Sequence, residues 1–154
     1  MKRLICLLFP LLLAAGLLSG CAEKEVLYSF TDGERVISVL GGSGRANYLS
    51  VTENGRDIWQ TRVRADRTVG TRGGTYGLRV EDVNFDGRND LIIALTVTDD
   101  ITTEQVYLQQ SDGSYRLNTE LDGKCNLSVD ARQELILAFD RTDITERDAG
   151  TDRT

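Results

Sequence analysis

The chain contains the run LRVEDVNFDGRNDLIIAL at residues 78–95. Its middle part carries oxygen-bearing side chains at every second position, then Gly87, then one more aspartate. Carboxylates this close together repel one another unless a cation joins them, and Ca²⁺ takes about six to eight oxygen ligands. We therefore expect a structural calcium-binding loop at residues 82–90. The expected ligands are the backbone carbonyl of Arg88 and the side chains of Asp82, Asn84, Asp86 and Asp90.

The sequence on both sides of this loop predicts β-strands. Leu91–Leu95 is a continuous apolar run, which is typical of a strand covered on both faces. Elsewhere, short alternating runs are separated by turn residues, and Asn54-Gly55 is a strong signal for a type I′ hairpin. We expect an all-β fold: an antiparallel meander sheet or sandwich, or a compact propeller-like module, with the calcium-binding loop between two strands.

The predicted strands are short and are joined mostly by tight turns. They are Val26–Thr31, Arg35–Leu40, Ala46–Thr52, Asp57–Val63, Leu78–Val83, Asp90–Thr98, Thr103–Gln110, Tyr115–Leu121, Leu127–Val129 and Glu134–Phe139. Tyr115–Leu121 is compatible with a single helical turn instead. Arg64–Gly77 is rich in Gly, Thr, Arg and Asp, and we expect a long, mobile, solvated loop there. Its basic cluster leaves an anion cradle open as an alternative, although no helix follows it. The cluster consists of Arg62, Arg64, Arg67 and Arg72.

The N-terminal sequence has the pattern of an export signal. It begins with Met1-Lys2-Arg3, is largely apolar from Leu4 to Leu18, and then reads Ser19-Gly20-Cys21. An apolar run of about fifteen residues is shorter than the roughly 20 needed to span a bilayer, and it fits the core of a signal peptide. The Leu-Ser-Gly-Cys ending resembles the bacterial lipobox. An ordinary secretory signal with an incidental cysteine is the alternative.

The lipobox resemblance implies a domain organisation and a location. Residues 1–20 would be a lipoprotein signal peptide, and Cys21 would be the acylated first residue of the mature chain, held by the lipid bilayer. Residues 21–25 would form a short membrane-proximal linker, 26–140 the β domain and 141–154 a disordered tail. The implied location is the cell envelope: the outer membrane or periplasmic side of a Gram-negative cell, or the surface of a Gram-positive one.

Composition and charge argue against several classes of function. The chain has 18 basic and 24 acidic residues, and removal of Lys2 and Arg3 with the signal peptide changes the net charge from −6 to −8. This acidity argues against nucleic acid and anionic membrane surfaces as partners and is compatible with a cationic protein. The chain has no histidine, which removes Ser-His-Asp and Cys-His sites, and no carboxylate pair has a spacing that sets it apart. We therefore do not expect an enzyme.

Cys125 is the single cysteine left for the β domain once Cys6 is removed and Cys21 is acylated. No internal disulfide can then form, so a metal ion is a natural substitute as a cross-link. Cys125 precedes an apolar alternation, and we expect it to be a small buried hydrophobic residue. A reactive thiol is the alternative.

The loop at 82–90 differs from an EF-hand, because strands flank it and Ile93 occupies the position of the bidentate glutamate. It resembles instead the loop of FG-GAP and VCBS repeats, the β-propeller blades known from integrin α subunits. A propeller needs several blades, and this motif occurs once. The order Val106-Tyr107-Leu108, Asp112-Gly113 and Tyr115–Leu121 is also similar to small secreted bacterial proteins of a lysozyme-inhibitor-like group.

These resemblances imply a binding function. We expect a membrane-anchored, calcium-stabilised β-domain lipoprotein that binds an envelope or extracellular protein, or a glycan. Lysozyme or muramidase inhibition is one form of this function, since lysozymes are usually cationic and an acidic domain attracts them. A structural envelope component without a soluble ligand is the other alternative.

Overall fold

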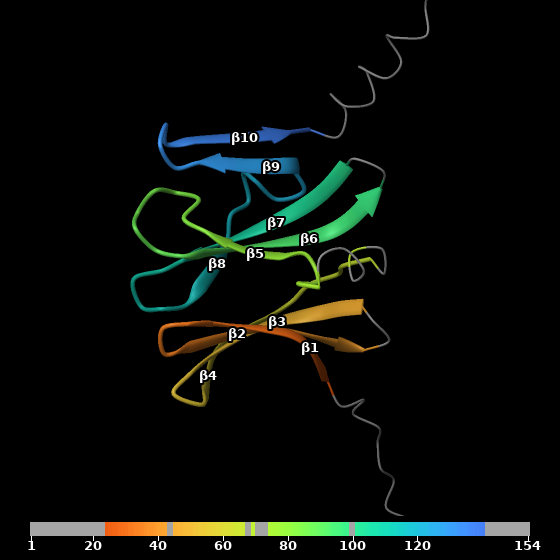
Figure 1. The fold of residues 1–154 in the computed structure, drawn as a ribbon, viewed down its shortest axis with the longest axis vertical. Coiled ribbons are helices and arrows are strands. Elements are labelled where there is room, and N and C mark those ends of the chain that lie inside the picture. The colour runs from red at the N-terminus through yellow and green to blue at the C-terminus, as the bar shows by residue number, and fades with distance from the viewer. Residues whose placement is uncertain (1–23, 43–44, 67–68, 70–73, 99–100, 141–154) are drawn as a thin grey trace, which may run out of the picture.

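The computed structural model describes residues 24–42, 45–66, 69, 74–98 and 101–140, which form two antiparallel β-sheets (Figure 1). The predicted all-β fold is confirmed, in its sandwich form. The predicted signal peptide, Cys21, most of the linker and the predicted tail lie outside the described residues. The described part of the chain contains no helix long and apolar enough to cross a membrane.

The first sheet is a four-stranded meander in the order β1-β2-β3-β4. Its strands are β1 (Glu25–Asp32), β2 (Arg35–Gly42), β3 (Arg45–Glu53) and β4 (Arg56–Arg62). The β3–β4 turn has φ angles of 51° at Asn54 and 74° at Gly55. These are the two positive values that a type I′ turn requires, so the hairpin predicted from Asn-Gly is confirmed.

The second sheet has the order β10-β9-β7-β6-β5, with β8 also paired to β7. Its strands are β5 (Leu78–Glu81), β6 (Asp90–Thr98), β7 (Ile101–Gln109), β8 (Tyr115–Leu117), β9 (Cys125–Asp130) and β10 (Leu135–Phe139). The link between β7 and β9 is the single register pair Thr103↔Cys125. From this link the β9–β10 hairpin turns away, so that Figure 1 shows it as an upper layer above β6 and β7.

Strand β6 lies between two hydrophobic cores. Leu91 and Ile93 are fully buried against the first sheet, and Ile92 is fully buried on the opposite face. That opposite face is covered by the β9–β10 hairpin, whose Leu127 and Ile136 pack in the same cluster as Ile92. The prediction that the apolar run is covered on both faces is therefore confirmed, and the second cover explains why the run does not alternate.

The larger core lies between the two sheets and includes an aromatic cluster. Trp59 of β4 stands edge-on to Tyr107, with ring centroids 5.4 Å apart, and contacts Tyr115 at 5.2 Å. Side chains from both sheets fill the rest of this core. They include Ile37, Val39, Leu49 and Val51 from the first sheet and Leu78, Leu91 and Ile93 from the second. Burial of such side chains, at about 1.5–3 kcal/mol each, is the main force that joins the two layers.

The connection between the two sheets is better anchored than its composition predicts. Val63, Ala65 and Val69 are 1–2% exposed and belong to the inter-sheet core. The Asp66 N–H also donates to the Leu95 carbonyl of β6 at 2.6 Å. Val63 and Ala65 continue the inward alternation of β4, whereas Val69 is an isolated apolar residue among polar ones and produces no pattern in the sequence.

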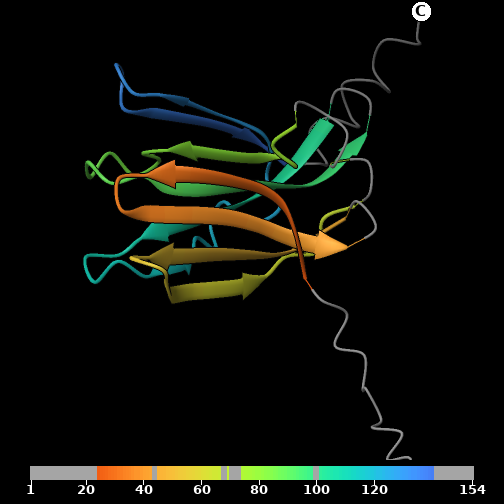
Figure 2. The same cartoon turned by 60° about the horizontal axis from the view of Figure 1, so that its bottom comes forward.

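Several connections between strands lie at the opposite end of the sandwich from the start of β1 and the end of β10. Figures 1 and 2 show the β1–β2, β3–β4, β5–β6, β7–β8 and β9–β10 connections at one end, which we call the loop end. The other end, which we call the base, holds the start of β1, the end of β10 and the residues where β3 begins and β4 ends. The predicted calcium loop therefore lies at the end remote from the start of β1.

Candidate metal site

Asp82 closes the first part of the β5–β6 loop. Its Oδ1 accepts the Asp86 N–H at 3.1 Å, and its Oδ2 accepts the Gly87 N–H at 2.8 Å. The turn needs φ angles of 60° at Phe85 and 81° at Gly87. Glycine takes such an angle readily, whereas a bulky residue such as phenylalanine does so only when surrounding interactions hold it there. The two hydrogen bonds to Asp82 supply that restraint.

Asp86 stands at the centre of the exposed part of the loop. Its Oδ1 accepts the Arg88 N–H at 2.9 Å, and its Oδ2 accepts the Asn84 side-chain amide at 3.0 Å and forms an ion pair with the Arg88 guanidinium. Desolvation in the loop opposes ionisation of Asp86, but the Asn84 and Arg88 hydrogen bonds outweigh it, so the pKa of Asp86 is lowered. The carboxylate is thus ionised at neutral pH and open to solvent.

Asp90 has a different environment from the other aspartates of the loop. It is fully buried, its Oδ1 accepts the Gln109 N–H of β7 at 2.7 Å, and its Oδ2 accepts the Val83 N–H at 2.9 Å. Burial raises the pKa of Asp90; the two backbone N–H groups offset part of this effect, and the charge of Asp86 adds to it. Asp90 therefore joins both ends of the loop to the neighbouring strand.

A further contact ties the loop to the first sheet. The Asn89 side-chain amide donates to Asp32 Oδ2 at 2.8 Å, at the turn where β1 ends. This contact joins residues 57 positions apart in the chain. The loop is thus held by β7 through Asp90 and by β1 through Asn89, both of which directly follow its exposed tip.

The chemistry of the loop fits a hard cation at its tip. The structure brings together the predicted ligands Asp82, Asn84 and Asp86 in one turn, and carboxylate and amide oxygens are the atoms that Ca²⁺ prefers. In the described residues no three Asp, Glu, Cys or His side chains already converge on one point. A cation would bind by drawing these oxygens away from the loop N–H groups and from the Arg88 guanidinium. Ca²⁺ would then neutralise the tip and cross-link it.

The structure separates the predicted ligands into two groups. Asp82, Asn84, Asp86 and Arg88 belong to the tip, where the guanidinium and the backbone N–H of Arg88 both bond to Asp86. Asp90 has both carboxylate oxygens engaged with backbone N–H groups away from the solvent. Cys21, the predicted lipidation site, lies outside the described residues.

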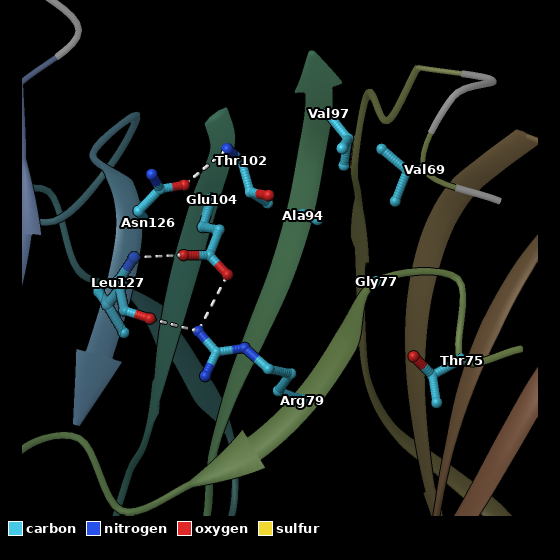
Figure 3. Close-up of a pocket in the computed structure, with 10 residues that line it drawn as sticks. All are labelled: Val69, Thr75, Gly77, Arg79, Ala94, Val97, Thr102, Glu104, Asn126 and Leu127. Atoms are coloured by element: carbon cyan, nitrogen blue, oxygen red, sulfur yellow. Dashed lines mark hydrogen bonds and ion pairs between the residues drawn. The ribbon is translucent and has the colours of Figure 1, made fainter. Parts of the chain in front are cut away.

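A buried carboxylate that the sequence did not single out lies in a pocket beside β9 (Figure 3). Glu104 of β7 is 5% exposed; its Oε1 accepts Arg79 at 2.9 Å and its Oε2 accepts the Leu127 N–H at 2.8 Å. Arg79 also donates to the Leu127 carbonyl and pairs with Glu81. The guanidinium is thus shared between two carboxylates and holds the β9–β10 hairpin against the sheet, which is a structural arrangement.

Cys125 is fully buried, as expected from the sequence, with its Sγ 3.7 Å from Thr103 Oγ1. It is a free thiol at the point where β9 leaves β7. Burial and a weak hydroxyl contact match the small hydrophobic residue predicted for this position.

The chain was compared with protein families, curated proteins and solved structures. No family model, curated protein or solved structure matches the chain. The resemblance to FG-GAP and VCBS loops therefore depends on the residues of the β5–β6 loop alone.

Proposed function

We propose that the chain is a lipid-anchored, calcium-stabilised β domain of the bacterial envelope that binds a macromolecular partner, rather than an enzyme. The observation that carries the proposal is the β5–β6 loop, where Asp82, Asn84 and Asp86 share one exposed turn braced by buried Asp90. Calcium bound at this tip would stabilise the loop end, and acylated Cys21 would hold the base at the bilayer.

Exposed apolar side chains on strand β10 support a protein partner. Leu135, Leu137 and Phe139 alternate along this strand and are 44%, 52% and 36% exposed. The residues between them, Ile136 and Ala138, pack in the core beneath. Strand β10 is also the edge of its sheet, and an apolar edge strand is a common surface for protein association.

Inhibition of a cationic lysozyme or muramidase is the second candidate, and the charge of the loop end favours it. Most ionised groups in the turns of this end are acidic, and they come from several different connections. They are Asp32, Glu34, Glu53, Asp57, Asp82, Asp86, Asp112, Asp130 and Glu134. A cluster of one sign steers an oppositely charged protein toward it and accelerates association.

The test uses the mature chain with the substitution Cys21→Ser, immobilised on a solid support. The immobilised protein is exposed to envelope extract and to purified muramidases, in the presence of calcium or of a chelator, and the bound material is measured. We expect a partner to be retained in calcium and lost with Leu137→Asp. Ile58→Asp is the matched control, because Ile58 is a similarly exposed apolar residue on β4. Inhibition of a muramidase would support the second candidate. Absence of any bound protein or glycan would contradict the binding function, and turnover of a cell-wall substrate would contradict the non-enzymatic one.

A further inference from the structure

Three arginine side chains gather at the base of the sandwich. Arg45 begins β3, Arg62 ends β4, and Arg64 follows in the connection to the second sheet. All three are exposed and line one hollow of about 330 Å³. Arg62 and Arg64 also line a second hollow of about 380 Å³ against Leu95 and Gln105.

The core fixes the direction of two of these side chains. Val63 and Ala65 are 1–2% exposed, so the alternation of the chain turns Arg62 and Arg64 outward on the same side. The segment cannot rotate freely, because the Val63 N–H donates to the Asn47 carbonyl at 2.9 Å and the Asp66 N–H donates to the Leu95 carbonyl. The two guanidinium groups are therefore presented by a rigid backbone.

Within the described residues, none of the three arginines forms an ion pair or a side-chain hydrogen bond. Asp66 lines the first hollow with them, but it already has an interaction within the protein. Lys24 adds a fourth positive charge beside Arg62: its Nζ lies 3.9 Å from the ring centre of Tyr48, the cross-strand partner of Arg62. Lys24 Nζ also donates to Gln60 Oε1 at 2.9 Å. Within the described residues, the three arginines thus form a local cluster of positive charge without an ion-pair partner, although the whole protein is acidic.

We propose that this base patch, Lys24, Arg45, Arg62 and Arg64, binds the phosphate groups of anionic phospholipids in the bilayer that holds the chain. The inference rests on the lipid anchor proposed above, because Lys24 lies three residues after Cys21 and β1 starts at the base. Clustered basic residues close to an anionic leaflet each strengthen attachment, and guanidinium groups suit phosphate oxygens. Bound in this way, the domain has its base against the membrane and its loop end directed away from it.

The test measures sedimentation of the mature, unacylated chain (Cys21→Ser) with vesicles. We compare phosphatidylcholine vesicles with vesicles that also contain phosphatidylglycerol. Binding should require the anionic lipid and weaken with salt. Arg62→Gln/Arg64→Gln should reduce it by about 25-fold, at about fivefold for each arginine. Both positions are exposed, so the variant should keep its melting temperature.

Arg56→Gln/Arg132→Gln is the matched control, since it removes the same charge from exposed positions at the loop end. The proposal requires this control to bind vesicles like the parent chain. Equal loss in both variants would mean that only net charge matters and would overturn it, as would absence of binding to anionic vesicles. Tight binding of soluble glycerol phosphate or a phosphorylated glycan without vesicle binding would overturn it too. Since the tested chain has no acyl group, failure here is distinct from failure of the anchor, which detergent partitioning of the native protein measures.

Discussion

The loop end and the base of the sandwich carry charges of opposite sign. They also differ in how far other groups of the protein bond to those charges. At the loop end, Asp82 and Asp86 accept backbone N–H groups, and Asp86 pairs with Arg88. At the base, Arg62 and Arg64 have no ion-pair partner in the described part of the chain. A charge that the protein satisfies itself contributes to folding, whereas an unsatisfied one on a rigid backbone is available to an external ligand. Charge count alone would not separate the two ends.

The largest expected effect is the loss of membrane attachment at the base, and it tests whether the base faces a membrane. Cys21→Ser should move the protein from the detergent phase to the aqueous phase. Each buried methylene of an acyl chain contributes about 0.8 kcal/mol, so loss of the chains removes nearly all of the attachment. Cys125→Ser is the control and should leave partitioning unchanged. If the Cys21 variant stays in the detergent phase, the base has no lipid anchor.

At the loop end, Asp90→Ala should cause the largest loss of folding stability. The substitution leaves the buried N–H group of Val83 and the partly buried N–H group of Gln109 without an acceptor, at about 1–3 kcal/mol each. We expect the free energy of unfolding to fall by about 3–5 kcal/mol in urea titration. The same change at exposed Asp86 should cost about 1 kcal/mol or less without calcium. Equal losses would remove the distinction between the buried brace and the exposed tip.

Calcium should stabilise the loop end by a smaller amount. An ion that binds only the folded state adds RT ln(1 + [L]/Kd), which is about 1.4 kcal/mol at ten times Kd. Extracellular sites bind at about 10⁻⁴–10⁻³ M, so millimolar calcium should raise the melting temperature by about 5 °C. Asp86→Ala should abolish the rise, while Asp112→Ala, in another turn of the same end, should retain it. Identical melting curves in calcium and chelator would contradict the metal site.

The smallest effect concerns Tyr115, whose buried hydroxyl has no hydrogen-bond partner within the described structure. Burial raises the pKa of Tyr115, and nearby Arg35 opposes this only in part. A raised folded-state pKa means that its stabilising contribution is present below pH about 10, the unfolded value, and is lost as pH rises through the folded-state value.

Tyr115→Phe should therefore reduce the loss of stability in alkaline solution, as followed by urea titration at several pH values. At neutral pH it should change stability by about 1 kcal/mol or less, because it removes an unsatisfied hydroxyl. Tyr48→Phe is the control, since Tyr48 is only partly buried and lies beside Lys24. If the free energy of unfolding of the Tyr115 variant falls with rising pH as it does in the parent chain, this hydroxyl does not contribute to the alkaline loss of stability.

Much of the fold could be predicted from the sequence, because its determinants are local. The Asn54-Gly55 turn and the apolar run Leu91–Leu95 appear in the structure where the sequence predicts them. The segment Tyr115–Leu121, predicted as a strand or a single helical turn, is a strand only as far as Leu117. The anchoring of Val69 was missed, because one apolar residue among polar ones gives no period.

The sequence by itself determined the β hairpins and the tip of the β5–β6 loop, since alternation, turn chemistry and the Asp82–Asp86 spacing act within a few residues. Tertiary structure alone decided the rest of the site. It gave Asp90 a burial that its place in the motif does not reveal, because its partner Gln109 belongs to another strand. It also brought Arg45 beside Arg62 and Arg64, since sheet pairing, and not sequence distance, sets which side chains share a surface.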